Sequence, residues 1–145
     1  MVIEPLRMED IPAVLEIEAD ALTAWNWEHL EDELHQSAGF QFVARGACNS
    51  MILAVLCGRL VADEAEILKL TVARSARRKG IGSSLLDFAL KYCKTRGAKN
   101  CFLELRSSNS AARKLYEKQG FFIAGMRPGY YDKPREDAIL MQLEF

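Results

Sequence analysis

The sequence lacks every feature that would place the chain in a membrane or in an oxidising compartment. No run of about 18 apolar residues exists, and the segment 1–6 has no basic stretch followed by an apolar one, so it does not predict a secretory signal. No two of the cysteines have the spacing of a zinc knuckle or a redox dithiol, and the two histidines are isolated. We therefore expect a cytoplasmic protein without a metal, whose thiols are small core residues: Cys48, Cys57, Cys93 and Cys101.

An excess of charge of one sign is also absent. The chain carries 19 Lys plus Arg against 20 Asp plus Glu, for a formal net charge of -1. No overall field draws it to nucleic acid or to a membrane, so neither is expected as a direct partner, and any anion site must come from a local cluster. With 145 residues, 50% of them hydrophobic, and neither repeats nor a linker, the sequence predicts a single domain over 1–145.

The order of apolar patterns predicts an α/β (α+β) fold in which helices flank a mixed central sheet. The run at 66–72, the helical pattern at 80–95 and the run at 101–105 form a crossover unit, which places two strands side by side in parallel. The other expected helices follow Asp10, Asn26 and either Ser108 or Asn109, and the other expected strands are 40–44, 51–57, 121–124 and 138–143.

A local anion site is predicted where the first crossover strand meets its helix. Four basic residues, Arg74, Arg77, Arg78 and Lys79, directly precede Gly80-Ile81-Gly82. A helix N-terminus offers free N–H groups, and glycine allows close approach of a ligand, so the segment suits a pyrophosphate. Neither a P-loop nor a complete dinucleotide fingerprint is present. Spacing alone leaves open a helix start with a solvated basic face, or a nucleic-acid patch.

Two motifs resemble one family. Arg-x-x-Gly-x-Gly at 77–82 is similar to the acetyl-CoA-binding motif of the GNAT N-acetyltransferases, and the segment 109–121 is similar to that family's N-x-x-A-x-x-x-Y-x-x-x-G-F signature. The segment 103–109, Tyr130-Tyr131 and 136–138 further resemble the RimI subfamily, which acetylates the N-terminal alanine of the eighteenth protein of the small ribosomal subunit. Thr23-Ala24-Trp25-Asn26 departs from the Phe-Pro-Trp-Ser-like segment of that subfamily in lacking the proline.

The resemblance implies the GNAT fold, acetyl-CoA as the acetyl donor, and a set of residues that contact it. Backbone amides of the strand at 70–72 would pair with the pantetheine arm, the Val72 N–H would face the developing oxyanion, and the helix start would hold the pyrophosphate. Asn109 would contact the cofactor, and it is also a good N-cap in its own right. The implied contact residues are Leu70, Thr71, Val72, Arg77, Arg78, Lys79, Gly80, Ile81, Gly82, Ser83 and Asn109.

Transfer of an acetyl group to an amine needs a proton acceptor and a proton donor. Glu104 stands in an otherwise apolar strand, and the resemblance implies that it accepts the proton of the attacking amine. From the residues alone it could equally lie on the solvent face of an edge strand or pair with Arg106. Tyr116 lies on an apolar helix face, and the resemblance implies that it protonates the departing thiolate. Its alternative is a core tyrosine whose hydroxyl meets a backbone partner.

The acceptor is the part of the reaction that the sequence constrains least. Tyr130, Tyr131 and Arg135 are expected in the loop between the last two strands, where they would form one wall of a groove for a peptide N-terminus or cover the loop's own core. The resemblance implies direct transfer in a ternary complex to a protein N-terminus. The competing hypotheses are a GNAT enzyme acting on a small amine, such as a polyamine or an aminoglycoside, and a non-catalytic module that binds acyl-CoA or RNA.

Overall fold

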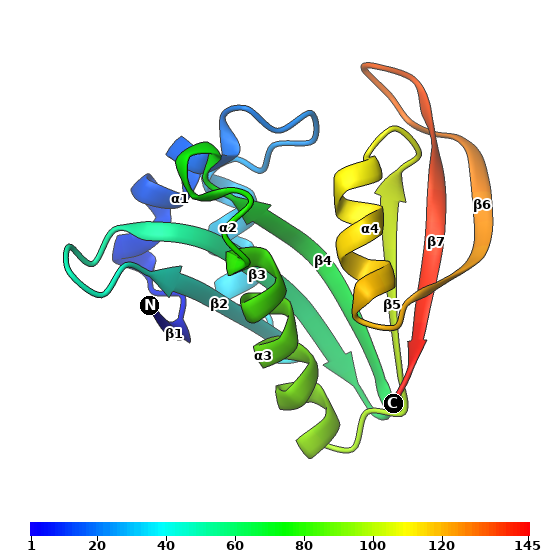
Figure 1. Cartoon of the computed structure of the whole chain (residues 1–145), viewed down its shortest axis with the longest axis horizontal. Coiled ribbons are helices and arrows are strands. Elements are labelled where there is room, and N and C mark those ends of the chain that lie inside the picture. Colours follow the sequence, from blue (N-terminus) through cyan, green and yellow to red (C-terminus); the bar gives the residue numbers. More distant parts are fainter.

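The computed structural model describes residues 1–145 and is built on one seven-stranded sheet (Figure 1). The strand order is β1-β2-β3-β4-β5-β7-β6, and β4 and β5 are the only neighbours that run parallel. The strands are β1 (Val2–Pro5), β2 (Gly39–Arg45), β3 (Ile52–Val61), β4 (Glu64–Val72), β5 (Asn100–Arg106), β6 (Phe122–Tyr131) and β7 (Glu136–Glu144).

Four helices cover the two faces of this sheet unequally. The amphipathic helices α3 (Ile81–Thr95) and α4 (Ser110–Lys118) lie on one face, whereas α1 (Ile11–Glu18) and α2 (Trp27–Leu34) cover the other face over β2, β3 and part of β4 (Figure 1). A core cluster of 20 buried residues fills the α3 and α4 side, and a cluster of 8 fills the α1 and α2 side. Because α1 and α2 do not reach β5, β7 and β6, the second face of these three strands carries no helix. None of the helices is long and apolar enough to cross a membrane.

The parallel strands β4 and β5 separate halfway along their length. Their pairing runs only from Glu64↔Asn100 to Ile67↔Leu103. At this point the register between β3 and β4 shifts, so that Cys57 pairs with Lys69 and Gly58 with Ile67. Such a bulge bends a strand and increases its twist. The segments 68–72 and 104–106 diverge toward the end of the sheet where α3 and α4 begin, as Figure 1 shows. We call this divergence the splay.

The structure confirms the α/β fold class and the crossover unit. It differs from the predicted strands near both termini. The strand β1 had not been expected. The strand β6 extends to Tyr131, so Tyr130 and Tyr131 lie in a strand and not in the predicted loop, whereas Arg135 does lie in the turn. The reason is that β6 is an edge strand, in which Pro128 and two register shifts are tolerated because one side needs no hydrogen-bond partner.

Candidate active site

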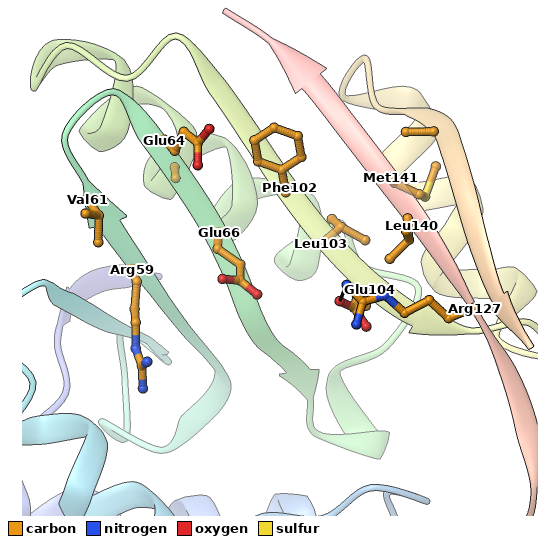
Figure 2. A pocket seen from close by; sticks show the side chains of 12 residues that line it. Arg59, Val61, Glu64, Glu66, Phe102, Leu103, Glu104, Arg127, Leu140 and Met141 are labelled. Atoms are coloured by element: carbon orange, nitrogen blue, oxygen red, sulfur yellow. Dashed lines mark ion pairs between the residues drawn. The ribbon is translucent and has the colours of Figure 1, made fainter. Parts of the chain in front are cut away.

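Glu104 stands at the fork of the splay. It follows Leu103, the last β5 residue paired with β4, and because Leu103 and Leu105 belong to the core beneath α3 and α4, its side chain points to the face without a helix. There it lines a hollow of about 550 Å³ between β4, β5, β7 and β6 (Figure 2). Its Oε1 lies 3.7 Å from Nη2 of Arg127, and its Oε2 is shielded from solvent without a hydrogen-bond partner. Strand β5 is internal and Glu104 does not pair with Arg106, so both alternatives for Glu104 are wrong.

Four further charged residues line the hollow with Glu104, and the sequence analysis missed their role: Arg59, Glu64, Glu66 and Arg127. Glu66 reaches it from β4, and its pKa is raised by burial first and by the charge of Glu104 second. Arg127 reaches it from β6 and remains half exposed. Glu66 could have been found, because it alternates with the buried Ala65 and Ile67. Arg127 could not, because it lies in the part of the edge strand β6 beyond 124, which the local pattern does not predict.

Tyr116 lies on the opposite face of the same sheet. It belongs to the large core cluster, its ring contacts Phe121 edge-on at 5.6 Å between centroids, and burial raises the pKa of its phenol well above the usual range. The side-chain hydrogen bonds at the two ends of α4 involve Asn109 and Gln119, and none involves the Tyr116 hydroxyl. A neutral phenol without an internal partner can donate its proton to a ligand on this face.

The start of α3 has the backbone geometry expected of the predicted anion cradle. Gly80 is the N-cap in a left-handed conformation (φ 78°), and the first helical hydrogen bond runs from Ser84 N to Gly80 O at 3.0 Å. The amides from Ile81 to Ser83 therefore have no partner inside the helix. A Cβ on Gly82 would lie 3.1 Å from Leu115 and 3.2 Å from Val72, so glycine lets α3 begin close against α4 and the end of β4.

Arg77 and Asn109 both have a structural partner in addition to their predicted contact with the cofactor. The Nε of Arg77 donates to the carbonyl of Val72 at 3.1 Å, which fixes the basic loop against the end of β4. The Oδ1 of Asn109 accepts from the N–H of Ala112 at 3.2 Å and caps α4. The predicted capping role of Asn109 is confirmed, and loss of either side chain would disturb local geometry as well as any ligand contact.

Gly80→Ala should weaken the binding of acetyl-CoA by roughly tenfold, since an L-residue pays about 1–2 kcal/mol in this conformation and relief of the strain would turn the cradle amides. Isothermal calorimetry measures the affinity. Gly97→Ala is the matched control, because Gly97 also has a positive φ (90°) with nothing within 4 Å and lies just beyond the other end of α3. Equal losses of affinity in both variants would contradict the cradle.

The three residues expected to contact the acceptor have different surroundings in the second half of β6 and the β6–β7 turn. Tyr131 is half buried under the guanidinium of Arg106, and its pKa is raised by burial and then by the charge of nearby Glu104. Tyr130 is exposed, meets Tyr131 edge-on, and lies beneath Arg127. The guanidinium of Arg135 covers the backbone of Gly129, where it braces the β6–β7 turn.

The cysteines have no part in this geometry. Burial raises the pKa of Cys57 to about 12, that of Cys101 to about 12 and that of Cys93 to about 11, and only Cys48 is exposed. At mildly alkaline pH, a thiol reagent should therefore modify only Cys48 in the native chain and all four cysteines after unfolding. Modification of Cys48 should leave catalytic turnover unchanged. Quantification of modified thiols by mass spectrometry, with Cys48→Ser as the control, checks this. Rapid modification of a second native thiol would contradict the assigned burial.

Comparison with known proteins gives the family. Residues 7–121 match the acetyltransferase (GNAT) family. The chain is 34% identical over 146 residues to the ribosomal protein bS18-alanine N-acetyltransferase of Escherichia coli (strain K12), with 97% of this chain and 95% of that protein covered. It is 33% identical over 141 residues to the protein of the same name from Salmonella typhimurium, with 95% and 93% covered.

A solved structure agrees with these sequence matches. The crystal structure of the ribosomal-protein-S18-alanine N-acetyltransferase from Escherichia coli superimposes with a TM-score of 0.89 at 32% identity, covering 99% of this chain and 92% of that chain. The family predicted from the motifs at 77–82 and 109–121 is thereby confirmed. The chain belongs to the GNAT acetyltransferase family and is an acetyl-CoA-dependent N-acetyltransferase.

Proposed function

We propose that this enzyme acetylates the N-terminal α-amine of a protein, and specifically the N-terminal alanine of the eighteenth protein of the small ribosomal subunit. The observation that carries this proposal is that relatives named for this reaction match 95–97% of the chain at 33–34% identity. The match extends across Glu104 and Tyr116 and across the segments that surround the hollow. A small-amine substrate has no comparable support.

In the proposed reaction the acceptor and the donor approach from opposite faces of the sheet. The pyrophosphate of acetyl-CoA would bind the amides at the start of α3, with Arg78 and Lys79 beside them, and its pantetheine arm would follow the unpaired edge of β4 at 70–72. The acceptor amine would enter from the hollow. The splay lets the two meet, because no hydrogen-bonded ladder closes the sheet between 68–72 and 104–106.

The proton transfers follow from the same arrangement. Glu104 takes a proton from the α-ammonium, and the neutral nitrogen attacks the carbonyl carbon of the thioester. The N–H of Val72 faces the oxygen that becomes negative. As the C–S bond breaks, Tyr116 donates its proton to the sulfur, and the amine nitrogen loses its remaining extra proton to water. Tyr116 regains a proton from water and Glu104 releases the one it accepted, so the full cycle releases one proton. The products are the N-acetylated chain and the free thiol of coenzyme A, with no acyl-enzyme.

The test is direct acetylation of defined amines. The enzyme is incubated with acetyl-CoA and a peptide bearing the N-terminal sequence of the ribosomal protein, and the site of acetylation is located by mass spectrometry. A gain of one acetyl group at the alanine α-amine is expected. The same peptide with its α-amine blocked is the control for acetylation of lysine. Turnover of spermidine or an aminoglycoside in place of the peptide would overturn the proposed acceptor.

A further inference from the structure

The connection between α1 and α2 is tied to both strands of the splay at one residue, Thr23. From β4, the Nζ of Lys69 donates to the carbonyl oxygen of Thr23 at 2.6 Å. From β5, the Nε of Arg106 donates to the Oγ1 of Thr23 at 3.0 Å. Both donors lie beyond Ile67↔Leu103, where β4 and β5 no longer pair with each other. Thr23 thus bridges two strand segments that have no direct ladder between them.

The charge of Lys69 is compensated at the end of α1, directly before the same connection. Its ammonium is 10% exposed and lies 2.9 Å from Oε2 of Glu18, which is 1% exposed. The same carboxylate oxygen accepts the N–H of Trp25 at 2.9 Å, and the Trp25 ring lies 5.3 Å from the ammonium. A buried ion pair contributes little net stability compared with apolar residues of the same size. Its defined contacts therefore point to a role in fixing the path of the chain.

Arg106 connects the same point to the β6–β7 turn. Its side chain is 8% exposed, and its Nη1 donates to the carbonyl of Pro134 at 2.9 Å and to Glu136 at 3.2 Å. The other oxygen of Glu136 accepts the N–H of Ser108 at 2.5 Å, just before α4. Only the planar, five-donor guanidinium can satisfy partners in these directions at once, and a lysine in its place would keep the charge but lose most of the bonds.

We propose that Thr23, Lys69 and Arg106 form a lock across the splay, which we call the Thr23 lock. They are positioning residues: they hold the 19–26 connection and the β6–β7 turn at a fixed separation on the acceptor side of the sheet. The predicted cradle for acetyl-CoA at the start of α3 shares none of the contacts of Thr23, Lys69 or Arg106, and the 19–26 connection meets the basic segment before it through the exposed pair of Asp20 and Arg74 at 3.5 Å. The lock therefore governs binding of the acceptor more than binding of acetyl-CoA. This inference rests on the proposed function.

Kinetics with Arg106→Lys and Thr23→Val test the lock. Arg106→Lys should raise KM for the acceptor peptide by roughly tenfold and leave KM for acetyl-CoA within about twofold. The reason is that a displaced 19–26 connection and β6–β7 turn reduce productive binding of the acceptor and not of acetyl-CoA. Thr23→Val removes one hydroxyl and should raise the acceptor KM by about threefold. The double variant should match Arg106→Lys, since the hydroxyl then has no donor to lose. Parallel increases in both Michaelis constants, or additive effects, would overturn the lock.

The matched control is Arg96→Lys. Arg96 also lies over a tyrosine ring, that of Tyr92, but it is at the end of α3 away from the splay. Its replacement makes the same chemical change and should leave both Michaelis constants within about twofold of the parent values. An increase in acceptor KM as large as that of Arg106→Lys would show that the effect does not belong to the lock.

Amide hydrogen exchange without any substrate separates this inference from the proposed function. Arg106→Lys should accelerate exchange in 19–26 and 127–136 by roughly fivefold or more, Thr23→Val only in 19–26, and Arg96→Lys in neither. If the parent enzyme acetylates no amine, the proposed function is wrong, yet this exchange pattern still decides whether the lock exists. Unchanged exchange in Arg106→Lys, or acceleration spread over the whole chain, would overturn it. Thr23→Val keeps the test open if Arg106→Lys does not fold.

Discussion

Glu104→Gln should lower kcat for an N-terminal peptide by roughly 100-fold near neutral pH, because the positioned base is lost while the shape of the side chain is retained. An α-ammonium has a pKa of about 8, so the amine deprotonates unaided as the pH rises. The deficit of the variant should therefore shrink toward pH 10, to roughly tenfold or less. A pH profile of kcat for both proteins measures this. KM for acetyl-CoA should change little, since Glu104 faces the hollow and not the cradle.

Glu144→Gln is the control for this prediction. Glu144 lies on the same face of the sheet as Glu104, but at the far end of β7 opposite Asn100, and it is exposed. The same chemical change there should leave kcat within about twofold. A Glu104→Gln deficit that stays constant from neutral to alkaline pH would contradict proton transfer and would leave Glu104 only a role in holding the acceptor. Stability should hardly change, since the pair with half-exposed Arg127 is worth little.

The local sequence pattern predicted the parts of the site that lie within one element or one connection. The basic loop and the glycines at 80 and 82 are adjacent in the chain, and they occupy the helix start as predicted. The apolar run around Glu104 placed it in a strand, which β5 confirms. These features depend on short-range backbone geometry, which local residue types largely determine.

The features that escaped prediction depend on distant pairing. Arg106 contacts Thr23 across 83 positions of the chain, and Lys69 contacts it across 46. No periodicity joins residues so far apart. The second half of β6 escaped for a different reason. Its start was predicted within 121–124, but Gly125, Pro128 and Gly129 are typical of turns, and only the edge position makes them compatible with a strand. One signal could have indicated a buried arginine with several hydrogen-bond partners, because Arg106 directly follows the largely apolar run 101–105.

Glu104 and Tyr116 lie on opposite faces of the sheet at the splay, so the proposed proton acceptor and the proposed proton donor have different surroundings. The hollow around Glu104 is open and charged, with three carboxylates and two guanidinium groups, and the core around Tyr116 is apolar and closed. A base works best where an ammonium is attracted and water can carry protons away. A phenol works best as a donor where burial keeps it neutral. The splay joins these two environments without mixing them.

Tyr116→Phe should lower kcat by roughly 100-fold, at the smaller end of what a proton donor contributes, because a thiol with a pKa of about 8.5 leaves fairly readily as the anion. The folded protein should be as stable as the parent or slightly more stable, since the hydroxyl has no internal partner to leave unsatisfied. Steady-state kinetics and thermal unfolding measure the two expectations together. A large loss of stability would show that Tyr116 acts through packing and not through its proton.

Titration gives an independent check on the same residue. Burial raises the pKa of Tyr116, so in the native enzyme its phenol should stay protonated above about pH 10, where an unperturbed tyrosine ionises. The unfolded chain releases this proton near pH 10, so stability from the neutral phenol is present below that pH and declines above it, and Tyr116→Phe should lessen the decline. Tyr92→Phe, in the aromatic cluster of α3 and β2, is the control and should leave kcat within about twofold. If the ultraviolet phenolate signal lost in Tyr116→Phe titrates at the ordinary pKa, Tyr116 is not the neutral donor that the reaction needs.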